Sequence, residues 1–540
     1  MQKNDLLLLR AESLGAEMEG VCRHEGMAVF VPGLLPGEEG SVRILKMEKR
    51  YAFGKLESLS SSSPDRVPPE CGAWPRCGGC TARHMRYAAS LEAKRRHVQD
   101  CLERIGHIRI DVPPLLGMEN PLGYRNKTSL PAGGTAGEPL LGFFAPRSHR
   151  LIPAADCPNS MPPTAGIAHA VLDWMKKHRI PPYDETAGKG LLRHVVVRVN
   201  RRGEAMVTLV AAGRSVPHAE ELWSALSPLG AVSLYLNENR KNTNVIFGER
   251  FELLRGRETL SAVLCGLRFE LSPASFFQIN PFQTERLYAT ALDFAAPGPE
   301  DTLCDVYCGA GTISLMMAGH CRQVTGIEIV PDAVRNAREN AERNGIQNAS
   351  FITGKAEEEL PRMVREGLRP DIIVVDPPRK GLDPEVITAV AAAEPDRLVY
   401  VSCNPATLAR DAVLLQDHGY EIHRIQPVDM FPYTSHVETV VSLSKGEISS
   451  KPVRVEFPLE GLDTSCLLND ATYQQIKDYV FEHTGLHVSN LYIAQVKAKH
   501  GIIERECYNK AKTEGGKVPK CPPEKEEAIE EALRHFRMIP

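Results

Sequence analysis

Residues 302–311, TLCDVYCGAG, are the stretch of sequence that indicates the fold class. They read as a buried strand, a short turn with two glycines and the beginning of a helix. Further strand-like runs follow at 323–329, 372–375 and 398–402, and helix-like segments separate them. This alternation predicts an α/β domain with a Rossmann-like, doubly wound parallel sheet over residues 273–445.

The chain before this region divides into two further parts. Residues 1–60 alternate apolar and polar side chains between closely spaced glycines, which predicts a small N-terminal β-barrel. A serine-rich run at 58–63 is typical of a linker. Residues 61–272 predict a mixed α+β central domain, with a helix over 86–107 and a hairpin around 200–203.

A charged tail of different composition occupies residues 446–540. The segment 446–450 separates it from the α/β domain, and residues 523–536 predict a helix. We interpret the tail as an accessory domain, and no motif in it indicates a role.

The bulk composition bounds the class of protein. The chain has 540 residues, of which 43% are hydrophobic, so several packed domains are expected. No apolar run approaches the ~20 residues that span a bilayer, and the N-terminus lacks the apolar core of a secretory signal. We therefore expect a cytoplasmic protein without a membrane partner. The net charge of −4 restricts any RNA-binding surface to a local basic patch.

The glycine turn and the ends of later strands supply candidate cofactor-binding residues. Glu328 follows Gly311 by 17 residues and can accept hydrogen bonds from ribose hydroxyls. Ser314 stands where a dinucleotide-binding loop has its third glycine, which argues against a nicotinamide-dependent oxidoreductase. The loop suits S-adenosylmethionine better, and a turn that binds no ligand is the alternative. Asp376 ends another strand and lies where such sheets bind ligands.

Cys403 lies between a predicted buried strand and a predicted helix. Pro405 is suited to the first turn of that helix. A thiol beside a helix N-terminus is expected to have a lowered pKa and to act as a nucleophilic thiolate. The alternative is a small buried core residue, which we favour for Cys265, Cys304 and Cys321.

Glu438 lies inside the apolar run HVETVV at 436–441. A buried carboxyl among apolar neighbours has a raised pKa that suits proton abstraction, whereas a surface glutamate on an edge strand is the alternative. A thiolate, a base and a sulfonium donor together predict methylation of uracil at C5. The thiolate adds to C6, C5 takes the methyl group, and the base removes the C5 proton so that the thiolate can leave.

A second group of cysteines is spaced for metal binding. Cys71, Cys77 and Cys80 lie close together, and Cys157 is the best candidate for a fourth ligand. The spacing alone leaves structural zinc, an iron–sulfur cluster and a site without metal as alternatives. The basic residues nearby predict either an RNA-facing surface or a solvated helix face. They are Arg83, His84, Arg86, Lys94, Arg95 and Arg96.

Five motifs, in this order, resemble those of the bacterial RNA uracil-C5 methyltransferase family. They are SFFQIN at 275–280, DVYCGAG at 305–311, DPPR at 376–379, SCNP at 402–405 and HVE at 436–438. The N-terminal barrel resembles the RNA-binding TRAM domain that many members carry. The resemblance covers roughly residues 5–445. It departs from the family pattern at Thr312, where members often have Asn, although a hydroxyl there could cap the helix.

The resemblance implies a role for each candidate residue. It makes Cys403 the nucleophile and Glu438 the base. It implies that S-adenosylmethionine is bound by Gln278, Tyr307, Glu328 and Asp376. It also favours a [4Fe–4S] cluster, with zinc as the alternative, on Cys71, Cys77, Cys80 and Cys157.

The resemblance also implies a substrate. Related enzymes with this cysteine arrangement act on ribosomal RNA, so we expect C5 methylation of a specific uridine in 23S rRNA by a monomeric enzyme. Two alternatives stay open: the same chemistry on tRNA, and an RNA-binding or ribosome-assembly factor whose methyltransferase fold is inactive. The presence of Cys403 and Glu438 argues against the second alternative.

Overall fold

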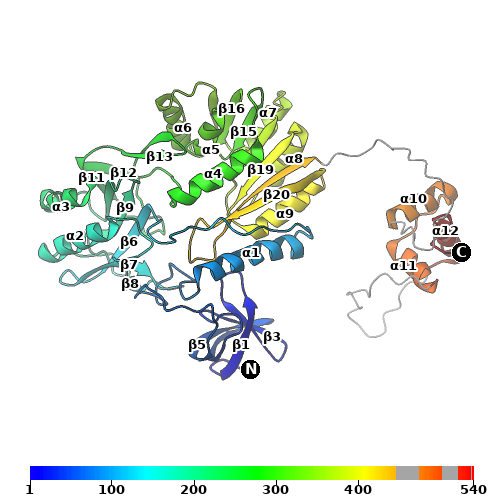
Figure 1. Cartoon of the computed structure of the whole chain (residues 1–540), viewed down its shortest axis with the longest axis horizontal. Helices are drawn as coiled ribbons and strands as arrows, with labels where there is room; N and C mark the ends of the chain where they lie inside the picture. The colour runs from blue at the N-terminus through cyan, green and yellow to red at the C-terminus, as the bar shows by residue number, and fades with distance from the viewer. Residues whose placement is uncertain (446–472, 501–520, 537, 540) are drawn as a thin grey trace. The chain divides into compact units, whose positions relative to one another are not determined.

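The computed structural model describes residues 1–445, 473–500, 521–536, 538 and 539. The chain divides into two compact units, Met1–Glu447 and Ile448–Pro540, and each is described by itself. Figure 1 shows the elements of both units. In the described part of the chain, no helix combines the length and the apolar character needed to cross a membrane.

Five strands near the N-terminus close into the predicted small barrel, in the order β1-β2-β3-β5-β4. The barrel interior is apolar, and Val29, Val31, Val42 and Ile44 are fully buried. The predicted linker is wrong for residues 58–61 of the serine-rich run, because β5 continues to Ser61 and pairs with β4 there. The strands are β1 (Leu6–Leu14), β2 (Gly20–His24), β3 (Met27–Val31), β4 (Glu39–Met47) and β5 (Tyr51–Ser61).

A seven-stranded sheet follows, in the order β12-β11-β10-β9-β6-β7-β8. The predicted hairpin is confirmed, since β9 and β10 pair antiparallel with Val199 opposite Ala205. Helices α2 and α3 pack on this sheet through side chains such as Val171 and Leu222. The elements are β6 (Lys127–Gly134), β7 (Pro139–Phe144), β8 (Leu151–Pro153), α2 (Thr164–Lys177), β9 (Leu192–Val199), β10 (Ala205–Ala211), α3 (Ala219–Leu226), η1 (Ser227–Leu229), β11 (Ala231–Glu238) and β12 (Arg250–Gly256).

The predicted doubly wound sheet is the second seven-stranded sheet, in the order β17-β16-β15-β18-β19-β21-β20 (Figure 1). Its first five strands are parallel, and β21 pairs antiparallel with both β19 and β20. The strand order reverses between β15 and β18, and ligands bind at the carboxyl ends of strands beside such a switch point. The strands are β15 (Thr302–Val306), β16 (Gln323–Glu328), β17 (Ala349–Thr353), β18 (Ile372–Val375), β19 (Arg397–Ser402), β20 (Tyr420–Val428) and β21 (Glu438–Lys445).

Helices cover both faces of this sheet, because alternate residues of its buried strands point to opposite sides. Ile373 and Val375 of β18 pack with α7, α8, α9 and α1, whereas Ile372 and Val374 pack with α4, α5 and α6. The β13–β14 hairpin joins the second of these cores through Phe269. The elements are α1 (Tyr87–Arg104), β13 (Leu260–Leu264), β14 (Leu267–Leu271), α4 (Pro281–Ala295), α5 (Thr312–Ala318), α6 (Pro331–Arg343), α7 (Ala356–Arg365), α8 (Pro384–Ala393) and α9 (Pro405–Gln416).

The described part of the C-terminal unit contains three helices around a small core that includes Ile476, Val480, Ile493 and Ile529. The helix predicted near the C-terminus is confirmed. The segment 446–450, interpreted as a separator, lies outside the described residues. The helices are α10 (Tyr473–Thr484), α11 (Asn490–Lys499) and α12 (Pro523–His535).

Candidate active site

The six residues predicted to bind the cofactor or to carry the chemistry line one cavity of about 990 Å³. It lies at the carboxyl ends of β15, β16, β18 and β19, where the fold leads us to expect a ligand. The structure thus brings together side chains that are far apart in sequence. They are Gln278, Tyr307, Glu328, Asp376, Cys403 and Glu438.

Glu328, the last residue of β16, is held in a defined orientation at the cavity wall. Its Oε2 accepts a hydrogen bond from the backbone N of Gly309 at 3.1 Å, and its Oε1 accepts one from the backbone N of Val330 at 2.8 Å. Each carboxylate oxygen can accept a second hydrogen bond, so the pair can still bind two vicinal hydroxyls.

The turn after β15 has the backbone strain that ligand-binding turns often carry. Tyr307 has φ of 105°, which a residue other than glycine rarely adopts. Gly311 has φ of 80°, and a Cβ there would lie 3.0 Å from the Cβ of Ala337. Glycine at 311 therefore lets the turn pack tightly against α6, while the backbone of Gly309 lines the cavity.

Two side-chain hydrogen bonds show what Ser314 and Thr312 contact. The hydroxyl of Ser314 donates to Oδ2 of Asp305 at 2.5 Å, and burial raises the pKa of that carboxyl to about 6. The Thr312 hydroxyl lies 2.8 Å from the hydroxyl of Tyr288, and no side chain caps α5. The expectation that Thr312 caps the helix is therefore wrong.

Cys403 lies at the predicted turn, between β19 and α9. Burial, followed by the nearby Glu438 and Asp376, raises the pKa of its thiol to about 11. The expected lowering of the pKa is wrong, because burial and two neighbouring carboxyl groups disfavour the thiolate. Asn404 is the residue that caps α9, and its Oδ1 accepts from the backbone N of Ala406 at 3.0 Å.

Glu438 is the first residue of β21, which lies inside the sheet between β19 and β20. The edge-strand alternative is therefore wrong. The side chain is buried, and burial together with Asp376 raises the pKa of Glu438 to about 8, which confirms the expected direction. Burial also raises the pKa of Asp376 to about 7, with a further contribution from Asp305.

Arg379 and Phe276 line the cavity as well, and sequence reasoning assigned neither of them a role at the site. The Arg379 guanidinium opposes the effect of burial, since it lowers the pKa of both Cys403 and Glu438. Its Nη2 lies 3.4 Å from Nε2 of His436. Phe276 is 73% exposed, and an exposed aromatic ring at a cavity can stack on a nucleobase.

A buried ion pair anchors the loop between β20 and β21, which leads to Glu438. Lys94 of α1 pairs with Asp429, and both side chains are fully buried. Tyr87 donates a hydrogen bond to the second oxygen of Asp429 at 2.6 Å. Lys94 is thus a structural cation. The interpretation of an RNA-facing surface is wrong for it and for Arg83 and His84, which are also buried.

The four cysteines predicted to bind metal converge on a second cavity of about 90 Å³. Two of their sulfurs accept hydrogen bonds: Cys77 from the backbone N of Gly79 and Cys80 from Nδ2 of Asn159, each at 3.3 Å. Burial, with a contribution from neighbouring cysteines, raises the pKa of Cys80 to about 11. The four residues are Cys71, Cys77, Cys80 and Cys157.

The spacing of these sulfurs bears on what they can hold. Among the described residues, one group of three candidate ligand atoms lies within 4.8 Å of one another, and it comes from His178, His218 and Glu221. The four cysteines do not form such a group. A single tetrahedral zinc needs sulfurs about 3.8 Å apart. The four cysteines therefore line one small cavity, and within the described residues no three of them form a group that compact.

The cysteine segment contacts the loop that carries the candidate base. The backbone N of Thr81 and that of Ala82 both donate to the carbonyl oxygen of Tyr433 at 3.0 Å. The Arg83 guanidinium lies over the Tyr433 ring, 4.4 Å from its centroid. The cysteine cavity and the large cavity therefore share one supporting segment.

Comparisons with known proteins agree with this geometry. The model of the tRNA (Uracil-5-)-methyltransferase family matches residues 256–446, and that of the TRAM domain matches residues 8–56. An uncharacterised RNA methyltransferase from Caldanaerobacter subterraneus is 44% identical over 436 residues, which are 80% of this chain and 96% of the relative. Another from Clostridium acetobutylicum is 40% identical over 451 residues, which are 82% of this chain and 98% of the relative.

A solved structure resembles most of the first unit. The crystal structure of the Pyrococcus abyssi tRNA (uracil-54, C5)-methyltransferase in complex with S-adenosyl-L-homocysteine is 28% identical in sequence and has a TM-score of 0.66. The match covers 81% of this chain and 99% of that chain.

Proposed function

Because the chain belongs to the S-adenosylmethionine-dependent RNA uracil-C5 methyltransferase family and carries a TRAM domain, we propose that Cys403 and Glu438 methylate C5 of a uridine in 23S rRNA. One observation carries the proposal. A thiol, a buried carboxyl with a raised pKa and the predicted cofactor-binding residues line the same cavity.

Cys403 is the nucleophile in this proposal. Its sulfur forms a bond to uracil C6, which moves the electron pair of the C5–C6 double bond into an enolate and makes C5 nucleophilic. The thiol must lose its proton for this step, and burial makes that unfavourable. Arg379 is the cation of this cavity that lowers the pKa of Cys403, so it stabilises the thiolate as the target uracil approaches.

Glu438 is the base that completes the reaction. After C5 has gained the methyl group, the carboxylate removes the C5 proton, the C5–C6 double bond forms again and the Cys403 sulfur leaves. With a pKa near 8, a minor fraction of Glu438 is ionised at neutral pH, and this carboxylate form is the one that accepts the C5 proton.

The donor side of the cavity suits S-adenosylmethionine, which supplies a methyl group from its sulfonium. Glu328 would accept hydrogen bonds from the ribose, because its two oxygens are oriented by backbone N–H groups. Asp376 lines the same cavity and raises the pKa of both Cys403 and Glu438, and a carboxyl with a pKa near 7 ionises readily beside a cation. Tyr307 and Gln278 line the remaining wall.

Phe276 would hold the target base. A uracil inside a folded RNA must leave its stack to reach Cys403, and enzymes of this kind replace the lost stacking with an aromatic surface. Phe276 is the large exposed aromatic side chain of the cavity. Phe276 and Cys403 line the same cavity, so the proposal assigns the stacking surface and the nucleophile to one site.

The cysteine cavity fits the [4Fe–4S] cluster that the resemblance implies. Cys71, Cys77, Cys80 and Cys157 would hold it, and N–H groups that donate to two of the sulfurs are typical partners of cluster thiolates. The cluster would fasten the segment that contacts Tyr433, and so support the loop that leads to Glu438. Anaerobically purified protein should then be brown, whereas stoichiometric zinc without iron would overturn this part of the proposal.

A tRNA uridine is the second candidate substrate. The description of the family and the name of the Pyrococcus abyssi enzyme both specify tRNA. The match covers 99% of the chain of that enzyme. The distinction is testable by mass spectrometric mapping of 5-methyluridine in rRNA and tRNA from cells with and without the gene. Loss of a single rRNA site supports the first candidate, and loss confined to tRNA supports the second.

The chemistry is tested with RNA that contains 5-fluorouridine. Fluorine at C5 cannot leave as a proton, so the bond between Cys403 and C6 should persist as a covalent protein–RNA adduct when the cofactor is present. We expect the adduct in the wild type and in Cys265→Ala, and none in Cys403→Ala. An adduct that persists in Cys403→Ala would overturn the mechanism.

A further inference from the structure

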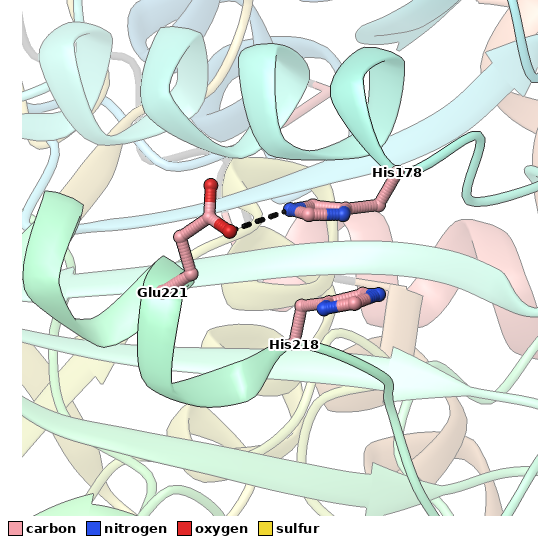
Figure 2. Close-up of side chains that lie close together, drawn as sticks. All are labelled: His178, His218 and Glu221. Atoms are coloured by element: carbon pink, nitrogen blue, oxygen red, sulfur yellow. Dashed lines mark hydrogen bonds and ion pairs between the residues drawn. The ribbon is translucent and has the colours of Figure 1, made fainter.

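A cluster of two histidines and a glutamate lies at the ends of α2 and α3, and it lines neither cavity described above. His178 follows the last residue of α2, whereas His218 and Glu221 lie at the start of α3. Figure 2 shows the two imidazole rings one above the other, with the Glu221 carboxylate beside them. Nitrogen and oxygen atoms of these three residue types are ordinary ligands of Zn²⁺.

The three side chains are close enough to share one ion. Their candidate ligand atoms all lie within 4.8 Å of one another. Nε2 of His178 lies 3.0 Å from Oε2 of Glu221, which is close to the ~3.3 Å between two ligand atoms of a tetrahedral zinc. An ion can therefore take the place of the hydrogen that these two atoms share. The His218 ring, which lies parallel to that of His178, would reach the same ion by a side-chain rotation that leaves both helices in place.

His218 lies beside the other two residues, and within the described part of the chain its ring nitrogens make no hydrogen bond. Its ring stacks on that of His178 with centroids 3.8 Å apart and an angle of 15° between the planes. It precedes α3 with φ of 55°, yet its side chain makes no capping hydrogen bond. A strained backbone whose side chain does not cap the helix is unusual for an N-cap position, and it leaves the imidazole available as a ligand.

Lys177 determines which carboxylate oxygen is available. Its ammonium pairs with Oε1 of Glu221, so Oε2 is the oxygen directed at His178. This pair orients the carboxylate, as hydrogen-bond partners of metal ligands commonly do. The same cation repels an incoming dication, which limits affinity. Glu221 and His218 are exposed, so water can complete the coordination.

We propose that His178, His218 and Glu221 form a binding site for a first-row transition-metal dication such as Zn²⁺, which would bridge α2 and α3 on the outside of the central sheet. The two imidazole ligands favour Zn²⁺ and Ni²⁺ over Mg²⁺ and Ca²⁺, which prefer sites made of oxygen ligands alone. The bridge would join two helices that pack on the same core, so it is structural rather than catalytic. It is also independent of the proposed methyltransferase chemistry.

Calorimetric titration of the full-length protein, purified anaerobically so that any metal on the cysteines is retained, tests this proposal. Zn²⁺ should bind with one equivalent at this site. Each of His178→Ala, His218→Ala and Glu221→Gln should weaken binding at least tenfold. Lys177→Gln should strengthen it, because the competing cation is removed. Zn²⁺ affinity that is the same in His178→Ala and His218→Ala as in the wild type would overturn the proposal.

A matched control and a spectroscopic probe separate this site from others. His169 forms a similar exposed pair with Asp156 at 2.7 Å but has no third ligand, so His169→Ala should leave Zn²⁺ affinity unchanged. Co²⁺ bound at the proposed site should show ligand-field bands without a thiolate-to-cobalt charge-transfer band. A thiolate band would assign the ion to cysteine and contradict the proposal. Methyl transfer should be unchanged in all three site variants.

Discussion

Glu438 and Glu221 lie in two regions that treat a carboxyl group in opposite ways. Glu438 lies in the large cavity, where burial and a second carboxyl raise its pKa to about 8. Glu221 lies on the surface, where hydrogen bonds from Lys177 and then His178 hold its pKa below the usual value. Burial beside like charge retains a proton, whereas exposure beside cations keeps a carboxylate ionised.

The two environments suit their carboxyl groups to different chemistry. A carboxyl that exchanges a proton near neutral pH suits acid–base chemistry, and a carboxylate that is always charged suits a cation.

Cys403→Ala should have the largest effect on activity. Without the sulfur no C6 adduct can form, so kcat for methyl transfer from S-adenosylmethionine to RNA should fall by at least about 10⁴-fold. Cys265→Ala, which changes a cysteine outside the cavity, should keep wild-type kcat. Residual activity within tenfold of the wild type in Cys403→Ala would exclude covalent catalysis by this residue.

Glu438→Gln should stop the reaction at a later step than Cys403→Ala does, after C5 has been methylated. Removal of a general base typically lowers the rate by about 10²–10⁴-fold. Because the thiolate can still add and C5 can still be methylated, a covalent adduct should accumulate even with ordinary uridine RNA, and a denaturing gel would detect it. Glu421→Gln, at an exposed position of β20, is the control. Loss of turnover without any adduct would argue for an earlier role of Glu438.

Lys94→Met tests the anchor of the loop that leads to Glu438. It leaves Asp429 buried without its cation, and breaking such a pair typically costs about 3–5 kcal/mol in the free energy of unfolding. Urea unfolding measures this cost. Lys176→Met, an exposed lysine of α2, should change little. The double variant with Asp429→Asn should recover part of the loss, and a failure to do so would mean that the pair is not the cause.

The stability of the wild type should fall with rising pH because of Glu438. Between the usual carboxyl pKa of 4.5 and the folded pKa of about 8, the folded state binds more protons than the unfolded state. The free energy of unfolding therefore decreases across this window, by about 1.4 kcal/mol for each unit of pKa difference. Urea unfolding of Glu438→Gln should show a flatter dependence, and equal slopes would contradict the raised pKa.

Glu221→Gln should have the smallest effect and the opposite sign. A carboxyl whose folded pKa is lowered stabilises the protein above its unfolded pKa of 4.5, and that contribution disappears as the pH falls through the folded pKa. The variant should be slightly less stable than the wild type at neutral pH and equally stable in acid. A difference in Tm that persists in acid would indicate a packing effect instead.

Much of the candidate site was predictable because its residues occupy ends of elements. Cys403 follows a buried strand, Asp376 follows another, and Glu328 ends a third. In a parallel sheet these ends lie on one edge, so their proximity follows from the strand order. Asp305 and Tyr288 were not singled out as site residues, because their hydrogen bonds to Ser314 and Thr312 depend on packing between elements.

The basic residues near the cysteines show the limit of reasoning from charge. Lys94 and Arg83 read as solvated or RNA-facing cations, yet both are buried. Lys94 is paired with Asp429, which lies 335 residues later in the chain. No local pattern predicts a partner at that separation, because it requires α1 to pack against the α/β domain.

The sequence by itself determined the α/β fold, the glycine turn, the barrel and six of the residues that line the large cavity. Strand periodicity, turn chemistry and motif order are local properties, so they can be read along the chain. Only the tertiary structure decided the protonation of Cys403 and Glu438, the burial of Lys94, and the meeting of His178 with His218 and Glu221. Burial and electrostatic coupling depend on everything that surrounds a group, and that surrounding comes from distant segments.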